Sequence, residues 1–200
     1  MVSPYFPPVE SALAEPNGLL AQGGDLSPAV LLDAYRHGIF PWFNPGEPIY
    51  WWSPDPRTVL VPGRVRVTRS LAKRMRNAGF EIRFDTAFAE VMRGCAGPRR
   101  DADGTWISPA MIRAYTRLFE QGYAHSVEVR LGDELVGGLY GVAIGGMFYG
   151  ESMFSRVSDA SKTALVALCR QLERRGFGLV DCQMETAHLL SMGAENWPRA

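Results

Sequence analysis

Apolar side chains recur at helical spacing in several segments of the chain, which predicts helices with one buried face. Ser27-Pro28 starts the first of these helices, and Gly38 lies where the chain turns out of it. The clearest helix starts at Ser108-Pro109 and stops at Gly122. Further helices are predicted after a cap at Thr68, after Asp85 or Thr86, over about residues 160 to 175 after Ser158 or Asp159, and through His188–Met192.

From Ser126 the apolar period changes to two, because Val127 and Val129 alternate with polar neighbours. The segments SVEVRL, ELVGGLYGVAI and MFYGESMFS are separated by Gly-containing turns and predict a three-stranded antiparallel meander. Three glycines interrupt the second segment and indicate a bulge or the close approach of another group. GLVDCQ predicts a further short strand. This order of strands and helices indicates an α+β or α/β sheet domain over residues 58–200.

The first 57 residues have a different composition and predict a small N-terminal α+β domain, residues 1–57. Residues 1–25 are rich in Pro and Gly and are expected to form an irregular arm. The following loop, IFPWFNPGEPIYWWSPDPR, combines aromatic rings with five prolines, which prevent long regular structure and stiffen it. Trp51 and Trp52 either form a small aromatic core or present a stacking surface. Trp42, just past a helix end, is expected to point outward.

Composition excludes several classes of protein. Lys plus Arg and Asp plus Glu both number 21, so only local patches of charge can indicate a nucleic acid. No apolar run approaches the roughly 20 residues of a membrane helix, and the N-terminus lacks the features of a signal peptide. The three scattered cysteines argue against a disulfide framework and suit a reducing cytoplasm. The three histidines are far apart, so no metal site is predicted.

One local patch of charge stands out. Seven basic residues and no acid lie between Arg57 and Arg76. This run is either a solvated helix face or a binding surface for phosphates. The nearby aromatic residues favour the second interpretation, because stacking rings beside a basic track hold single-stranded RNA ends. The predicted phosphate patch consists of Arg64, Arg66, Arg69, Lys73, Arg74 and Arg76.

Three polar residues are candidates for chemistry. Glu151 is a lone carboxylate among aromatic residues and methionines, and it is either a paired structural acid or a ligand for a cation. Asp181 and Gln183 are two apart on a predicted strand, so their side chains should share a face at the end of that strand. They are either site residues or capping groups for the next helix. Cys182 should point the other way, as a core thiol. The chain has no P-loop, Rossmann glycine motif or GxSxG motif, which argues for direct group transfer without a covalent intermediate.

The chain resembles the leucyl/phenylalanyl-tRNA–protein transferase family. The matching segments occur in the family's order over about residues 5 to 199; they are EPNGLLAQGGDLSPAVLLDAYRHGIFPWF, YWWSPDPR, GTWI, AHSVEV, ELVGGLYGV, GESMFSR, ASKTAL and DCQ. The resemblance implies an α+β fold, with a small N-terminal domain followed by a domain similar to GNAT acetyltransferases. It implies transfer of Leu or Phe, and less readily Met, from aminoacyl-tRNA to an N-terminal Arg or Lys, without a cofactor. Such transfer marks proteins for the bacterial N-end degradation pathway.

The resemblance also assigns roles to residues. It places the contacts of the tRNA 3′-terminal adenosine at Trp42 and Trp106, the acid beside the acceptor peptide at Glu151, and the reaction centre at Asp181 and Gln183. The apolar aminoacyl pocket falls on Leu139, Phe148, Gly150, Met153, Ser155, Leu165, Leu168 and Val180. Because Leu168 replaces an aromatic residue of the family, the pocket is expected to be wider there. The enzyme is expected to be a cytoplasmic monomer with no membrane contact.

Two other functions compete with this interpretation. A GNAT-like acyl-CoA transferase would need a glycine-rich turn before its pyrophosphate-binding helix, and SRVSDASKT has no glycine. A non-catalytic RNA-binding module would use the basic run and the tryptophans. Trp106 itself is either a hydrophobic anchor or an exposed ring.

Overall fold

The computed structural model describes residues 3–97 and 105–199. Its helices comprise η1 (Val9–Ser11), α1 (Pro28–Arg36), η2 (Pro62–Arg64), α2 (Arg69–Asn77), α3 (Phe88–Cys95), α4 (Pro109–Glu120), α5 (Ala160–Arg174) and α6 (Ala187–Ser191). Its strands comprise β1 (Leu19–Gln22), β2 (Phe40–Pro41), β3 (Tyr50–Trp52), β4 (Arg57–Leu60), β5 (Glu81–Phe84), β6 (Ala124–Leu131), β7 (Glu134–Ile144), β8 (Met147–Ser155), β9 (Leu179–Gln183) and β10 (Glu195–Trp197).

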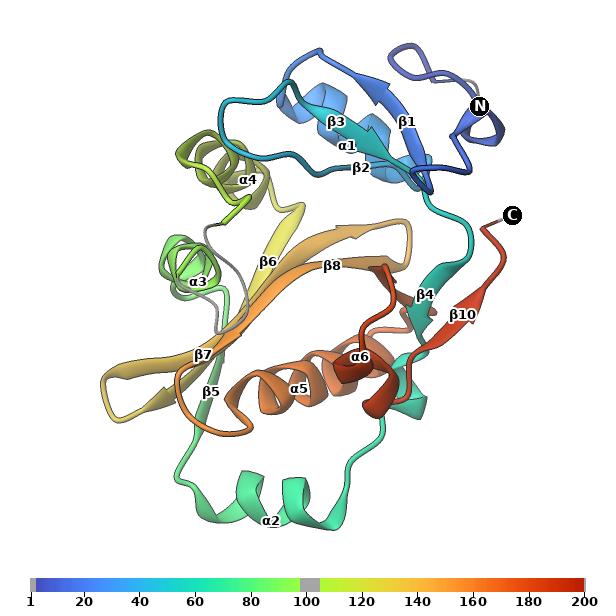
Figure 1. Cartoon of the computed structure of the whole chain (residues 1–200). Helices are drawn as coiled ribbons and strands as arrows, with labels where there is room; N and C mark the ends of the chain where they lie inside the picture. The colour runs from blue at the N-terminus through green and yellow to red at the C-terminus, as the bar shows by residue number, and fades with distance from the viewer. Residues whose placement is uncertain (1–2, 98–104, 200) are drawn as a thin grey trace.

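The strands form two sheets (Figure 1). The small sheet has the order β1-β3-β2, and the large sheet has the order β10-β4-β9-β8-β7-β6-β5. Within the large sheet β8 and β9 run parallel and the other pairs are antiparallel. A parallel pair needs a crossover connection, and α5 supplies it between β8 and β9. The predicted α+β class and the three-stranded meander, β6-β7-β8, are therefore confirmed.

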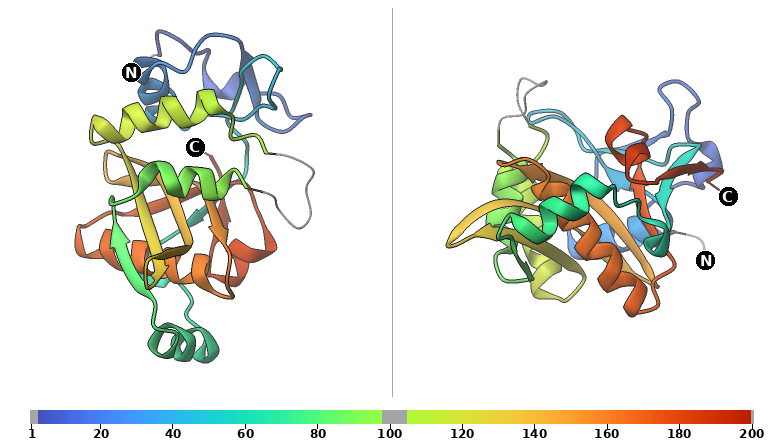
Figure 2. Two further views of the ribbon diagram at one scale, coloured as in Figure 1. Left: turned by 90° about the vertical axis from the view of Figure 1, so that its left-hand side faces the viewer. Right: turned by 90° about the horizontal axis from the view of Figure 1, so that it is seen from below.

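Helices cover both faces of the large sheet (Figure 2). Buried residues of α1, α3, α4 and the small sheet form one hydrophobic cluster on one face of the large sheet. Buried residues of α5 form a second cluster on the other face. β7 contributes to both clusters, because Leu139 belongs to the α5 cluster and its neighbour Tyr140 to the first. The first cluster thus joins the small sheet to the large one. Sheet membership changes between Trp52 and Arg57, and the domain boundary at residue 57 stays a prediction.

Several local predictions were wrong. The N-terminal arm is not wholly irregular, because β1 pairs with β3 in the small sheet. Asp85 and Thr86 do not cap α3, whose N-cap residue is Ala87. Asp85 instead accepts hydrogen bonds from His125 and from the backbone N–H of Ser126, which join the end of β5 to β6. Strands β4, β5 and β10 were not predicted, since each is only three or four residues long.

The predicted helix caps at Thr68 and Ser108 are confirmed. Thr68 and Ser108 accept hydrogen bonds from backbone N–H groups in the first turns of α2 and α4. Trp51 is a core residue: it is 2% exposed, and its indole N–H donates to the carbonyl of Gly23. The three cysteines are buried, and none of them is in a disulfide. In the described part of the chain, no helix is long and apolar enough to cross a membrane.

The predicted close approach at the β7 glycines is observed. A Cβ atom on Gly141 would lie 2.1 Å from the carbonyl oxygen of Tyr149 and 2.5 Å from the ring of Phe148. The β7–β8 register also shifts between Tyr140 and Gly141. Glycine is therefore required where β7 and β8 shift register.

We predict that Gly141→Ala destabilises the protein by about 2 kcal/mol or more, because the added methyl group overpacks the sheet. For a chain of this size the melting temperature should fall by roughly 4–8 °C in a thermal unfolding experiment. Gly178→Ala is the matched control, since no atom lies within 4 Å of its added Cβ. Equal melting temperatures for the two variants would contradict the prediction.

Candidate active site

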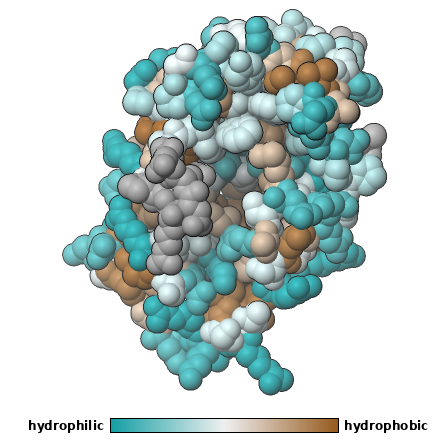
Figure 3. Space-filling view, viewed as in Figure 1, coloured by the Kyte–Doolittle hydropathy of each residue, from teal (hydrophilic) through white to brown (hydrophobic). Residues whose placement is uncertain are grey.

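A cavity of about 480 Å³ lies at the junction of the small sheet with the large one. Its walls come from β2, β7, β8, β9, α5 and α6, together with the residue that leads into α4. Its volume is in the range of small-molecule sites. The space-filling view shows the molecule hollowed at this junction (Figure 3).

Most of the predicted aminoacyl pocket lines this cavity. The predicted residues that do so are Leu139, Gly150, Met153, Leu165, Leu168 and Val180. They come from β7, β8, β9 and α5, so the pocket lies between the sheet and the helix. Aliphatic and thioether side chains dominate its surface, which therefore suits an apolar group.

The other two predicted pocket residues do not line the cavity. Phe148 is 1% exposed and packs beneath it, with the edge of its ring against Gly141. Ser155 is exposed at the end of β8, where its hydroxyl donates to the carbonyl of Val157 and accepts from the N–H of Ser161. Ser155 thus shapes the turn into α5, and its predicted place in the pocket is wrong.

Both predicted stacking residues reach the cavity. Trp42 is 40% exposed and packs edge-on against Trp52, whose indole N–H donates to the carbonyl oxygen of Trp42 at 2.7 Å. Trp106 is half-buried on the other side, just before α4. The predicted outward direction of Trp42 is confirmed, and two indole rings from different parts of the chain line one cavity.

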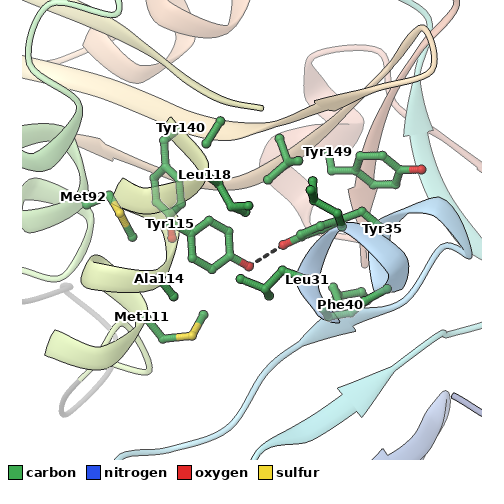
Figure 4. Packing of buried hydrophobic residues seen from close by; sticks show 14 of the residues in the cluster. Leu31, Tyr35, Phe40, Met92, Met111, Ala114, Tyr115, Leu118, Tyr140 and Tyr149 are labelled. Carbon is green, nitrogen blue, oxygen red and sulfur yellow. Dashed lines mark hydrogen bonds between the residues drawn. The ribbon is translucent and has the colours of Figure 1, made fainter. Parts of the chain in front are cut away.

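Glu151 lies in a network of hydroxyl groups. Tyr35 donates to Oε1 at 2.7 Å and Tyr115 donates to Oε2 at 3.2 Å. The two tyrosine hydroxyls are also hydrogen-bonded to each other, as Figure 4 shows. Tyr35 belongs to α1 and Tyr115 to α4, and both are fully buried. The acid is therefore held jointly by the N-terminal part of the chain and the large domain.

Burial favours the protonated form of Glu151. It raises the pKa of the carboxyl group to about 7, although the hydrogen bonds from Tyr35 and Tyr115 favour the ionised form and oppose this change.

Asp181 does not line the cavity. Its carboxylate accepts hydrogen bonds from Nε of Arg57 at 2.9 and 3.1 Å and from the backbone N–H of Gln183 at 2.9 Å. Arg57 is 6% exposed and also donates to the carbonyl of Gly38 at 2.8 Å. The predicted reaction-centre carboxylate is therefore part of a buried ion pair behind the wall.

Gln183 does line the cavity, and its amide donates to Glu151 Oε1 at 3.3 Å. Its φ angle is 60°, in the left-handed region that few residues other than glycine adopt. This conformation breaks the alternation of the strand. As a result Cys182 and Gln183 both face the cavity, and the predicted shared face of Asp181 and Gln183 is wrong.

Comparisons with known proteins show the family of the chain. The leucyl/phenylalanyl-tRNA protein transferase family matches residues 59–200, and its N-terminal domain matches residues 24–55. The chain belongs to this family. The leucyl/phenylalanyl-tRNA–protein transferase of Thiobacillus denitrificans is 74% identical over 98% of this chain and 86% of its own length. That of Nitrosomonas europaea is 64% identical over 98% of this chain and 83% of its own length.

The fold extends beyond the family. FemX has a TM-score of 0.55 at 12% identity, with 86% of this chain and 66% of that chain covered. A protein of unknown function from Bacteroides thetaiotaomicron has the same TM-score and identity, over 69% of this chain and 55% of that chain. The α+β architecture, with an N-terminal domain ahead of a larger domain, is confirmed, and the chain shares its fold with FemX.

Membership of the transferase family identifies the chain as an aminoacyltransferase that uses aminoacyl-tRNA and a protein acceptor. Family membership therefore favours an aminoacyltransferase over the two alternatives, an acyl-CoA transferase and a non-catalytic RNA-binding module. Among the described residues, no group of three His, Cys, Asp or Glu side chains could hold a metal ion.

Several residues of the transferase site were not predicted. The cavity is also lined by Phe40, Pro41, Tyr140, Ser152, Cys182, Met184, Thr186, His188 and Leu189. Tyr35 and Tyr115 were not predicted as site residues either. A buried tyrosine usually has a hydrogen-bond partner, and that rule was the available signal. Burial raises the pKa of the Cys182 thiol well above its usual range, which does not suit a nucleophile.

The predicted phosphate patch lies elsewhere on the transferase. All six of its residues are exposed, four of them on α2 and two just before it. α2 packs on α5 through Leu71 and Met75, at the end of the large domain away from the small sheet (Figure 1). The patch is therefore separate from the cavity, and its contact with tRNA stays a prediction.

We predict that Glu151→Gln removes a pH-dependent loss of stability. Because the folded-state pKa of Glu151 is raised, its protonated form stabilises the fold at low pH, and this is lost as pH rises from about 4.5 through 7. The unfolding free energy of the variant minus that of wild type should increase by about 2 kcal/mol from pH 5 to pH 8, as measured by urea titration. Glu120→Gln on α4 controls for loss of an exposed charge. A difference that is constant with pH would contradict the prediction.

Proposed function

We propose that this enzyme transfers Leu or Phe, and less readily Met, from aminoacyl-tRNA to the N-terminal Arg or Lys of proteins. The carrying observation is a cavity with an apolar wall at one side and one carboxyl group, Glu151, at the other. The apolar wall suits the donor side chain and the carboxyl group suits a cationic acceptor. The product would enter the bacterial N-end degradation pathway, with the enzyme acting as a cytoplasmic monomer.

The donor end of the cavity supports a 3′-aminoacyl adenosine. The Trp42 and Trp106 rings at the opening can stack on the adenine, because every base has a π-face. The aminoacyl side chain then lies against Met153, Leu165 and Leu168. Leucine at 168 in place of an aromatic ring leaves room for a large donor side chain such as that of Phe.

The acceptor end supports a basic residue. Glu151 is the carboxyl group that lines the cavity among the described residues, and a cation beside it would favour its ionised form. Gln183 lies next to it and can orient the acceptor amine through its amide. Asp181 bonds the backbone of Gln183 and does not reach the cavity, so we assign it as a positioning residue and not as a base.

The reaction is aminolysis of an ester. The neutral α-amino group attacks the ester carbonyl, a tetrahedral intermediate forms, and the ribose 3′-oxygen leaves with a proton as the amide forms. An α-amino group has a pKa of about 8, so an appreciable fraction is already neutral near pH 7. Placing amine and ester together in one cavity then supplies much of the rate.

Labelled Phe-tRNA and a peptide with N-terminal Arg test the proposal. We expect phenylalanine on the Arg peptide and far less on the same peptide with N-terminal Ala. Glu151→Gln should lower kcat/KM for the Arg peptide by about 10–100-fold, since a charge-assisted hydrogen bond is lost. Equal transfer to the Arg and Ala peptides would sink the acceptor assignment, and tRNA binding without transfer would sink the donor assignment.

A pair of tryptophan variants tests the stacking sites. Trp42→Ala should raise KM for Phe-tRNA by about 5–100-fold, because stacking of one base contributes roughly 1–3 kcal/mol. Trp197→Ala is the matched control, since Trp197 is 39% exposed but does not line the cavity. If both variants changed KM equally, Trp42 would have no special role.

A further inference from the structure

A second groove, of about 490 Å³, follows the junction of the small sheet and α4. Its first wall is the segment before α1 together with Ile49, and its second wall is one stripe of α4. In Figure 2 α4 lies between the N-terminal segments and α3, and the groove takes its lining from those segments and from α4.

The α4 wall of the groove carries two arginines that have no ion-pair partner among the described residues. Arg113 and Arg117 are one helical turn apart and are both exposed. Neither forms an ion pair or hydrogen bond with a described residue, whereas Arg57 and Arg83 are each paired with a carboxylate. The two guanidinium groups thus project from one helix face without a partner among the described residues.

One acid also lines the groove, on the opposite wall. The carboxylate of Asp25 accepts a hydrogen bond from the backbone N–H of Ser27 at 2.7 Å, at the start of α1. This hydrogen bond holds the Asp25 carboxylate against the wall formed by the segment before α1. The α4 wall remains positive, and an anion in the groove would lie against that wall.

The groove and the catalytic cavity belong to the same junction. The cavity takes Phe40 and Trp42 from the N-terminal part, and Trp106, three residues before α4. The groove takes its residues from the same part and from α4 itself. A strand that ends at the Trp42–Trp106 opening can therefore continue along α4 past Arg113 to Arg117.

We infer that Arg113 and Arg117 bind backbone phosphates of the tRNA strand that leads to the 3′-terminal adenosine. This inference rests on the proposed function, which puts that adenosine at the two tryptophans. A guanidinium group can donate two parallel hydrogen bonds to the oxygens of one phosphate. Binding of two phosphates releases their counterions, so the affinity for tRNA depends on salt concentration. The contacts are independent of sequence and position the strand.

The test compares two donors with the double variant Arg113→Gln/Arg117→Gln. For Phe-tRNA, KM should rise about tenfold, and the slope of log affinity against log salt should become shallower by about 1.4, at roughly 0.7 for each phosphate of a single strand. For 3′-O-phenylalanyl-adenosine, which lacks those phosphates, kcat/KM should be unchanged. Arg170→Gln/Arg174→Gln, an exposed pair at the same spacing on α5, is the matched control and should leave both donors unaffected.

Three results would overturn the inference: an equal loss with both donors, an unchanged salt slope for tRNA, or the same effect from the α5 pair. Melting temperatures of both double variants exclude misfolding as the cause. If the wild-type enzyme bound Phe-tRNA without transferring phenylalanine, the proposed function would fail. The salt dependence of that binding would still decide the role of the groove.

Discussion

The buried ion pair of Arg57 and Asp181 is the interaction on which the site depends. It joins β4 to β9, and through the carbonyl of Gly38 it also reaches the turn after α1. The carboxylate then fixes the backbone of Gln183. A buried pair of this kind contributes little net stability, but removing either partner costs about 3–5 kcal/mol, because the other charge stays buried. Its role here is geometric, because it holds the backbone of Gln183, which lines the cavity.

The tyrosine–glutamate network makes the second connection between the two parts of the chain. Tyr35 comes from the N-terminal part and Tyr115 from α4, and both depend on Glu151 in β8. Around them the first hydrophobic cluster seals the junction, with Leu31 and Met111 fully buried beside the two rings (Figure 4). The cavity is therefore not a feature of the large domain alone. The N-terminal part supplies one wall, including Trp42, and one of the hydroxyl groups that hold Glu151.

Sequence patterns predicted the parts of this structure that depend on local periodicity. The β6-β7-β8 meander and α5 followed from apolar spacing and turn residues, and the family motifs led to most of the cavity wall. The orientation of Asp181 could not be predicted, for two reasons. Its partner Arg57 is 124 residues away, and the positive φ of Gln183 breaks the two-residue period on which the prediction relied. The Tyr35–Tyr115 contact spans 80 residues and was likewise invisible to periodicity.

The raised pKa of Glu151 has a consequence for recognition itself. A carboxyl group with a pKa of about 7 is roughly half protonated in a neutral cell. A cation that enters the cavity favours the ionised form and expels the proton, so its binding is coupled to proton release. The heat of binding would then vary with the ionisation enthalpy of the buffer, and affinity for a basic group would rise with pH. Binding of a neutral group of the same size releases no proton. The preference of the cavity for a basic group over a neutral one therefore depends on the pH of the solution.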